Sequence, residues 1–450
     1  LRDCPPFAPQ HRPGLSKADD EQWERIYAEG KASESAGNLA RAIERYAAAA
    51  EIDDRHADLQ FRLARAYWSL GEYEQARELY IAARDLDCLR FRADSRINQI
   101  IRSVAEEKPG SDVRFADVVA AVADRSPQQV PGAEFFYEHV HFTFQGNHLL
   151  ARTVLEQLEA ALPERFPRAH GTRDVLTVEQ SAKLLAHTEW DHRRIIGNVL
   201  KAYVGSPPFV VQIYHEEGEK RLGDQFRKLH LSTLPRGLED AVEQYRNAIQ
   251  RYPSDWELRW KFSGLLASGL KDYPESLVQI REAAETYPDF RILNQLGNRS
   301  RILGDLDEAE AAYLRSLEIT SSSAAHFGLG RVLRAKGHLG GAIKQFKRAV
   351  EVPFSRSDAA FLALAGSQRE AGEADEAITT LRTGIHMLPQ EATAPFHFRL
   401  AILLDQKGNT DEAVVELREA LRVLPSEGHP DRLKFRMKLD ELLRKRAYRE

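Results

Sequence analysis

The sequence predicts a mostly α-helical protein in which stacked helix pairs form a solenoid, with one short segment of mixed α/β character. A residue pattern recurs every 33 to 36 residues over about two thirds of the chain. Glycines stand at the same place in most copies, where the first helix of a pair should end, and prolines follow several second helices. Each pair leaves an apolar face that only the next pair can cover, so the pairs should stack.

Composition and charge are those of a globular protein. Of the 450 residues, 43% are hydrophobic and 29% are charged, which is too apolar for a disordered chain. The net charge of −5 gives no general attraction to nucleic acid, and no apolar run approaches the ~20 residues of a membrane span. Two cysteines exclude a disulfide framework and a cysteine-based zinc site. We expect no nucleic-acid partner, no membrane span in this chain and no cofactor.

The chain begins with Leu1 instead of Met, in the abrupt run LRDCPPF. We interpret it as a piece of a longer protein. No signal peptide is visible, so the sequence indicates no compartment.

The repeat consists of Gly, an apolar residue two positions later, Ala three further on, an aromatic residue or Leu after four more, and then a small residue. The first copy is formed by Gly37, Leu39, Ala42, Tyr46 and Ala49. A second copy lies 34 residues later, and the pattern resumes near Ala241. The later copies are centred on Ser276, Ala309, Ala342, Ala377 and Ala413. We therefore predict two repeats in residues 17–87 and an array of about six in residues 236–428.

This period and residue order resemble the tetratricopeptide-repeat (TPR) family. The resemblance implies a scaffold whose concave face, built by the first helices, holds a protein or peptide partner. Two copies depart from the pattern. The copy ending at Pro253 lacks the Leu-Gly pair, and the copy ending at Pro288 has Tyr273-Pro274 in its turn. We expect looser geometry there.

Residues 429–450 lack a partner repeat and are predicted to form a capping helix. Its apolar stripe would comprise Leu433, Met437, Leu439, Leu442 and Leu443. The tail from Arg432 carries eight Lys/Arg against three Asp/Glu, which we interpret as a solvated cap in preference to a nucleic-acid patch.

Residues 88–162 break the repeat. Residues 92–104 are predicted as a helix, residues 113–117 (VRFAD) as a short strand, and a helix begins at about Asn147. Alternating helix and strand indicate part of an α/β domain. Residues 163–235 contain helical stretches at 178–188 and 191–204 and are predicted to be a helical spacer.

The run Glu138-His139-Val140-His141-Phe142-Thr143, with Gly146 behind it, resembles the last sequence block of the SGNH (GDSL-type) hydrolases, Asp-x-x-His followed by a final helix. The resemblance implies that His141 is the base of a Ser-His-Asp triad and Glu138 the acid that orients it. Glu stands in place of Asp, and Phe142 in place of the usual Pro. No Gly-Asp-Ser run is present, so the resemblance implies that the nucleophile lies before Leu1 and that this chain alone does not hydrolyse esters.

The opening LRDCPPF also resembles a segment of TPR-containing SGNH proteins. On this interpretation residues 1–16 and 88–162 belong to one domain, and the repeats of residues 17–87 are inserted in it. Cys4 and Cys88 should then lie close together, with Cα atoms within about 12 Å but without a disulfide bond.

Other clusters have alternative interpretations. His139, His141 and His148 are less favoured as metal ligands because no third carboxylate or cysteine ligand is evident. His187 and His192 flank Trp190 and are interpreted as packing residues. Three arginines, Arg90, Arg92 and Arg96, are interpreted either as an anion site or, preferably, as a solvated face paired with Asp94. Two functions remain open, a binding scaffold and an ester hydrolase or acyl-transfer enzyme with the repeats as its targeting arm.

Overall fold

The computed structural model describes residues 1–107, 114–162, 176–353, 357–424, 426 and 428–447. Within these ranges every regular element is helical, and the single β feature is an isolated antiparallel bridge between Phe136 and Phe142. The fold is thus mostly α, as the sequence predicts. The chain divides into two compact units, residues 1–248 and 249–450. In the described part of the chain, no helix combines the length and hydropathy that crossing a membrane requires.

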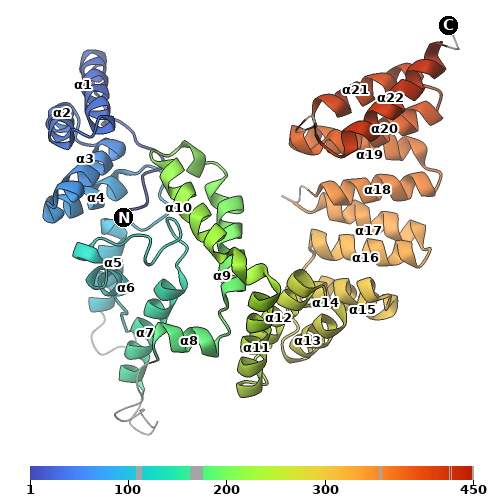
Figure 1. Cartoon of the computed structure of the whole chain (residues 1–450), viewed down its shortest axis with the longest axis horizontal. Helices are drawn as coiled ribbons and strands as arrows, with labels where there is room; N and C mark the ends of the chain where they lie inside the picture. Colours follow the sequence, from blue (N-terminus) through green and yellow to red (C-terminus); the bar gives the residue numbers. More distant parts are fainter. Residues whose placement is uncertain (108–113, 163–175, 354–356, 425, 427, 448–450) are drawn as a thin grey trace. The chain divides into compact units, whose positions relative to one another are not determined.

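The first unit opens with two stacked helix pairs (Figure 1). Their helices are α1 (Lys17–Ser35), α2 (Leu39–Ile52), α3 (Ala57–Leu70) and α4 (Tyr73–Leu86). Gly37 and Gly71 take φ of 76° and 85°, a left-handed conformation that glycine adopts without steric cost, and so end the first helices. Ala42 and Ala76 are fully buried where the helices of each pair cross, so both predicted repeats are present as helix pairs.

Among the described residues that follow in this unit, the chain forms seven further α-helices, the last of which crosses the boundary to the second unit. They are α5 (Ser95–Glu106), α6 (Val118–Asp124), α7 (Phe144–Ala161), α8 (Val178–Leu184), α9 (Glu189–Val199), α10 (His215–Lys228) and α11 (Pro235–Arg251). The predicted strand at residues 113–117 is wrong for its described part, because residues 114–117 form no strand; Val113 lies outside the described residues. Asp117 instead caps α6 by accepting a hydrogen bond from the backbone N–H of Ala120 at 2.9 Å. A lone extended run without a neighbour cannot form a ladder, so the described part of residues 88–162 shows helices and loops where an α/β segment was predicted.

The described part of the predicted spacer is built into the first unit. One buried cluster contains Ile196 and Val199 of α9, Val204 in the turn after α9, Leu222 of α10 and Tyr137. Residues 176–235 therefore contribute to the core of this unit and do more than connect two arrays.

The segment before α1 and the segment after α4 contact each other, at residues 7–8 and 87–88. The backbone N–H of Cys88 donates to the carbonyl oxygen of Ala8 at 3.2 Å. The Asp87 carboxylate accepts from the backbone N–H groups of Phe7 and Ala8 at 2.9 and 3.0 Å. Cys4 and Cys88 are both free. These contacts agree with the expected insertion of residues 17–87, although the domain boundaries themselves stay a prediction.

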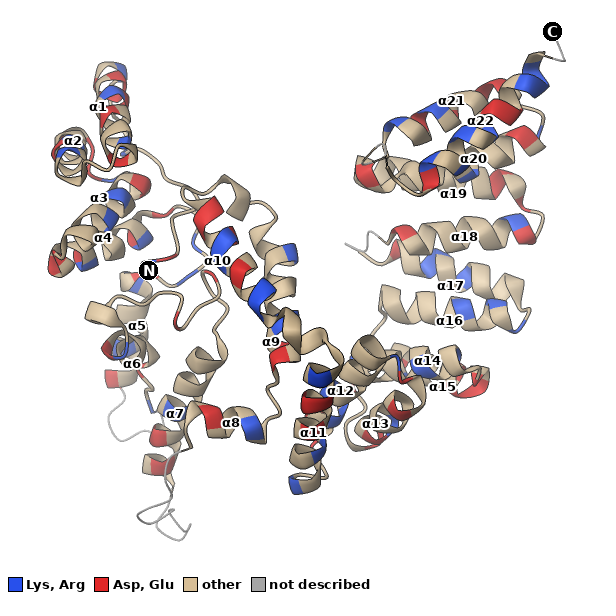
Figure 2. Ribbon diagram, in the orientation of Figure 1, with Lys and Arg blue, Asp and Glu red and all other residues tan. Residues whose placement is uncertain are grey.

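In the described part of the second unit, the helices follow one another as five consecutive pairs, which can be traced in Figure 1. They are α12 (Trp256–Leu265) with α13 (Tyr273–Thr286), α14 (Phe290–Leu303) with α15 (Leu306–Ile319), α16 (Ser323–Ala335) with α17 (Leu339–Glu351), α18 (Asp358–Glu370) with α19 (Ala374–Met387), and α20 (Ala394–Gln406) with α21 (Thr410–Arg422). The predicted copy centred on Ala241 corresponds to a single helix, α11, which takes the place of the second helix of a repeat. Its pattern residues Ala241, Tyr245 and Ala248 are buried. Acidic and basic side chains are interspersed along the helices of both units (Figure 2).

The copy with Tyr273-Pro274 departs from the regular turn, as expected. Residues 266–270 form a π-helical turn, and Lys271 takes the left-handed conformation that glycine occupies in the neighbouring repeats. Pro274 stands in the first turn of α13, where it needs no hydrogen-bond donor.

The capping helix is α22 (Asp431–Ala447), which packs on α21. Its predicted stripe is partly wrong, because Leu433 and Met437 are 70% and 65% exposed. The buried side chains are Phe435 and Leu442, with Leu439 and Leu443 packed beside them. This set follows i, i+4, i+7 and i+8 spacing and so lies on one face of the helix.

Candidate functional site

Glu138 and His141 form a hydrogen-bonded pair on the loop before α7. Glu138 is buried, and its carboxylate accepts from the backbone N–H groups of Val140 and His141 at 3.1 and 2.9 Å. One of its oxygens also bonds Nδ1 of His141. The His141 side chain is 43% exposed, and its ring packs 4.6 Å from that of Tyr203. A carboxylate on Nδ1 favours the tautomer that leaves Nε2 as an unprotonated acceptor, the form that a general base needs.

Local structure explains why this loop holds its shape. The Thr143 hydroxyl accepts from the N–H of Gly146 at the start of α7 and donates to the carbonyl of Glu134 at 3.0 Å. At Gly146 a Cβ atom would lie 2.5 Å from the carbonyl oxygen of Phe135, so a larger residue would push α7 away. The sequence block thus builds a compact turn followed by α7.

The pair lacks a nucleophile within reach. No Ser, Thr or Cys side chain is hydrogen-bonded to His141 in the described part of the chain, and His141 lines neither of the two cavities described below. What the geometry provides is an oriented imidazole at the surface of the unit.

The other histidines of this region have separate partners. His139 is buried and bonds the carbonyl oxygen of Pro5 through Nε2 at 2.7 Å, and burial lowers its pKa to about 3. His148 bonds the carbonyl of Leu176 at 3.0 Å. His187 stacks on Phe144 with ring centroids 4.3 Å apart, and burial lowers the pKa of His192. Across the described ranges no three His, Cys, Asp or Glu side chains gather in a way that would hold a metal ion.

The arginines before α5 serve structural roles. Arg90 pairs with Asp94, which is the interpretation that the sequence favoured. Arg92 donates to the carbonyl oxygen of Cys4 at 3.1 Å, and burial lowers the pKa of its guanidinium. It lines an apolar cavity of about 320 Å³ together with Cys4, Val122, Phe136 and Phe142.

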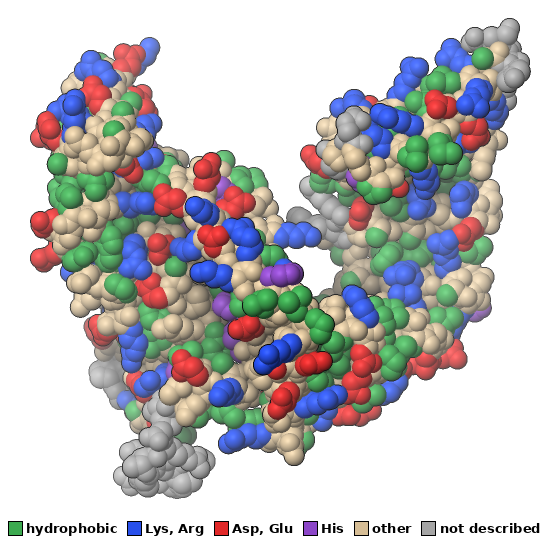
Figure 3. Space-filling model, in the orientation of Figure 1, with side chains coloured by type: hydrophobic (Ala, Val, Ile, Leu, Met, Phe, Trp, Pro, Cys, Tyr) green, Lys and Arg blue, Asp and Glu red, His purple; other side chains and the backbone are tan. Residues whose placement is uncertain are grey.

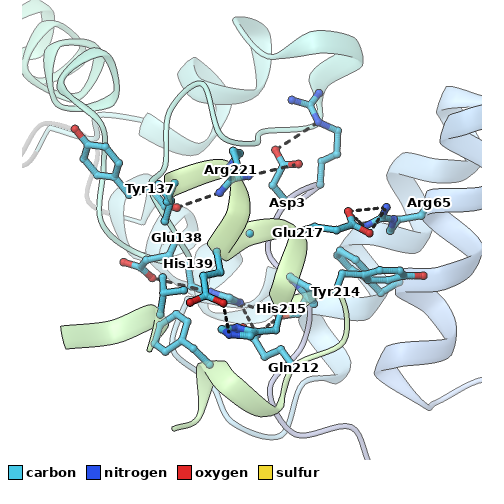
Figure 4. A pocket seen from close by; sticks show the side chains of 18 residues that line it. Asp3, Arg65, Tyr137, Glu138, His139, Gln212, Tyr214, His215, Glu217 and Arg221 are labelled. Atoms are coloured by element: carbon cyan, nitrogen blue, oxygen red, sulfur yellow. Dashed lines mark hydrogen bonds and ion pairs between the residues drawn. The ribbon is translucent and has the colours of Figure 1, made fainter. Parts of the chain in front are cut away.

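A second, polar cavity of about 150 Å³ collects residues from four separate segments (Figure 4). It is lined by residues 2–5, by α3, by the loop at 137–139 and by residues 204–222. Arg221 donates to the carbonyl oxygen of Tyr137 at 3.1 Å, and Gln212 donates to that of Pro5 at 2.6 Å. No local sequence pattern indicates this cavity, because its lining residues are far apart in the chain; Pro5 and Gln212, which are hydrogen-bonded, are separated by 207 positions.

In the second unit, three arginines from three successive first helices lie close together. We call this the arginine groove, formed by Arg334 of α16, Arg369 of α18 and Arg399 of α20. Guanidinium atoms of Arg334 and Arg399 both come within about 4 Å of the position that a Cβ of Gly366 would occupy. Beside them lies a hollow of about 430 Å³, lined by Arg369, Arg399, Ile402, Pro395, Phe398, Phe435, Asp431 and Lys434. Figure 3 shows Lys and Arg side chains gathered over these helices.

The charges of the arginine groove are poorly balanced within the chain. Glu370 pairs with Arg334, but no carboxylate bonds Arg369 or Arg399 in the described part of the chain. The pKa of Arg399 is lowered by burial and then by the nearby charges of Arg369 and Arg334. Like charges held together at a partly buried surface favour an anion that neutralises them.

Comparisons with known proteins identify the repeats. Tetratricopeptide-repeat models match residues 35–87, 303–360 and 327–392. No curated protein matches the sequence significantly. Among solved structures, YrrB, a TPR protein with an unusual peptide-binding site, is 20% identical with a TM-score of 0.34, over 41% of this chain and 95% of its own. Yeast Tom70 is 13% identical with a TM-score of 0.43, over 96% and 91%. PilF of Pseudomonas aeruginosa is 19% identical with a TM-score of 0.37, over 48% and 96%.

Proposed function

We propose that this TPR scaffold binds an acidic protein segment in the arginine groove. The observation that carries the proposal is the convergence of Arg334, Arg369 and Arg399, of which only Arg334 has a carboxylate partner in the described part of the chain. Guanidinium groups bind carboxylates through paired hydrogen bonds. The hollow beside them adds Ile402 and the stacked rings of Phe398 and Phe435, whose centroids are 4.4 Å apart. A peptide of alternating acidic and apolar residues fits this chemistry.

The test is the binding of a fluorescein-labelled peptide rich in Glu and Leu, followed by anisotropy. Arg399→Glu should weaken binding at least about tenfold, because it removes one cation and adds a repelling charge. The matched control is Arg348→Glu, which makes the same change on the exposed face of α17. Raising the salt concentration from 50 to 300 mM should also weaken binding, since exposed charges are screened. Equal losses in both variants, or equal binding of a Lys-Leu peptide, would contradict the proposal.

We propose a second function for the Glu138–His141 pair, as the acid and base of an SGNH-type ester hydrolase or acyl-transfer site. The specific support is the hydrogen bond between the buried Glu138 carboxylate and Nδ1 of His141, whose side chain is 43% exposed. The nucleophile and the oxyanion donors would come from residues outside this sequence. The repeats would then act as the arm that brings the enzyme to its partner.

p-Nitrophenyl acetate hydrolysis distinguishes the possibilities. This chain alone should be inactive, because a base acts only when a nucleophile is within hydrogen-bond reach. A chain extended at its N-terminus should hydrolyse the ester and lose about 10²–10⁴-fold in rate on His141→Ala. Activity of this chain that disappears on His141→Ala would overturn the assignment of the nucleophile.

A further inference from the structure

In the two N-terminal repeats, formed by α1 to α4, the face that would bind a partner is already occupied. In TPR arrays the first helices line the binding face, and here these are α1 and α3. The segment at residues 212–217, which enters α10, lies against them. Its contacts are made by two side chains, Tyr214 and Glu217.

Tyr214 is held by a partly buried charge pair, Glu34 and Arg62. Its hydroxyl bonds one carboxylate oxygen of Glu34 and accepts from the guanidinium of Arg62 at 3.0 Å. Arg62 also donates to the other oxygen of Glu34 at 2.8 Å and to the hydroxyl of Tyr27 at 3.0 Å. The hydrogen bond of Tyr46 to Glu34, at 2.5 Å, completes the cluster. The Tyr214 hydroxyl is therefore hydrogen-bonded to a residue of α1, Glu34, and to a residue of α3, Arg62.

The ring and the following turn are held as well. The guanidinium of Arg65 stacks over the Tyr214 ring at 3.8 Å and bonds the Glu217 carboxylate at 3.0 and 3.1 Å. One arginine thus contacts both anchors of the segment. A planar guanidinium can stack on an aromatic ring and bond a carboxylate at the same time, which the ammonium group of Lys cannot do.

The backbone of the segment is strained into this position. Tyr214 takes φ of +56°, a left-handed conformation that residues other than glycine rarely adopt. The residue is the N-cap position of α10 but makes no side-chain cap bond, because its hydroxyl is directed to Glu34. Contacts with α1 and α3 hold the residue there.

We propose that the two N-terminal repeats bind a segment of their own chain, residues 212–217. Tyr214 and Glu217 are the two side chains that anchor this segment. In this role the repeats are an internal clamp, separate from the arginine groove. By holding residues 212–217, these repeats also position two residues that line the polar cavity. Gln212 donates to the carbonyl oxygen of Pro5, and Arg221 of α10 donates to that of Tyr137. The groove chemistry, an arginine for a carboxylate beside a Glu-Arg pair for a phenol, fits a Tyr-x-x-Glu sequence.

Hydrogen exchange of the full chain tests the clamp. Arg65→Glu should speed exchange of residues 213–222 about tenfold, which is the factor expected when a local opening becomes easier by one charged anchor. The double variant Arg65→Glu with Glu217→Arg should recover part of the lost protection, because it rebuilds the ion pair in reverse but not the stacking of Arg65 on Tyr214. The control Arg25→Glu makes the same charge change on an exposed position of α1 and should have no effect.

A general loss of structure in Arg65→Glu would also speed exchange in α2 and α4, and the double variant then decides. Its failure to recover any of the lost protection, or unchanged rates in Arg65→Glu, would overturn the proposal. A labelled peptide of residues 208–222 gives a second measurement. It should bind the variant Tyr214→Ala with Glu217→Ala at least about tenfold more tightly than the wild-type chain, whose groove is filled. Equal affinity for the two would also overturn it.

Discussion

Individual residues show how closely the repeats are packed. Tyr313 and Phe346 fill the space between helices only because glycines face them. A Cβ at Gly297 would lie 2.9 Å from the Tyr313 ring, and one at Gly330 would lie 2.6 Å from the Phe346 ring. At this scale a single methyl group is too large, because packed interiors have no spare volume.

Two glycines of neighbouring helices should therefore respond in opposite directions to the same change. Gly330→Ala should lower the melting temperature, since overpacking costs about 1–3 kcal/mol. Gly340→Ala, on α17 with no atom within 4 Å of its added Cβ, should stabilise by up to about 0.5–1 kcal/mol. Thermal melts followed by circular dichroism measure both. A loss in Gly340→Ala as large as that in Gly330→Ala would show that the close approach is not the cause.

Among the elements, those specified by local sequence were predicted and those specified by distant contacts were not. The turns at Gly37 and Gly304 follow from glycine alone, because the left-handed conformation is required at a fixed place in the repeat. The run at residues 114–117 alternates like a strand, but it has no neighbouring strand to pair with. The role of residues 212–217 was invisible because Tyr214 meets Glu34 across 180 positions. For the site, the sequence indicated the Glu138–His141 pairing through its spacing, but neither cavity.

The end of the second unit gives a prediction for an element. Phe435 of α22 is 2% exposed and stacks on Phe398, so Phe435→Ala should destabilise the last repeat by about 3–5 kcal/mol. Leu433→Ala, at a position 70% exposed, should change stability by less than about 0.5 kcal/mol. Hydrogen exchange in α20 and α21 reports both. Equal protection in the two variants would show that α22 does not cap the array.

The basic tail of α22 bears on its proposed interpretation as a solvated cap. Lys438 and Lys445 both pair with Asp405, and Arg446 pairs with Asp411. These cations are already used to hold the helix on α20 and α21. The arrangement favours the cap over a nucleic-acid surface.

At the scale of a whole unit, the first unit should lose stability in acid. In the first unit, burial lowers the pKa of His56 to about 4 and that of His139 to about 3. An unfolded chain protonates these rings near pH 6.5, so below that pH the unfolded state binds more protons than the folded one. The contribution of these two neutral rings to the free energy of unfolding is therefore fully present above pH 6.5. It is lost as the pH falls toward their folded-state pKa values of about 4 and about 3.

At pH 5 the loss from His139 is up to about 2 kcal/mol. The free energy of opening in α2 and α4, from hydrogen exchange corrected for intrinsic rates, should fall between pH 7.5 and pH 5. His139→Gln should be less stable at pH 7.5 but should lose less on acidification, because the titrating ring is gone. The same loss in the variant and the wild-type chain would show that His139 is not responsible.

The point where Ala8 meets Cys88 has a consequence for synthesis on the ribosome. Helices α1 to α4 lie entirely between these residues, so they can fold as soon as this stretch has left the exit tunnel. Tyr214 is made 126 residues after Cys88, which at 5–20 residues per second is a delay on the order of ten seconds. During that interval the newly folded helices present Arg62, Arg65 and Glu34 without their occupant. A nascent chain would therefore pass through a stage in which this surface is open to chaperones or to a neighbouring nascent chain, and completion of α10 ends that stage.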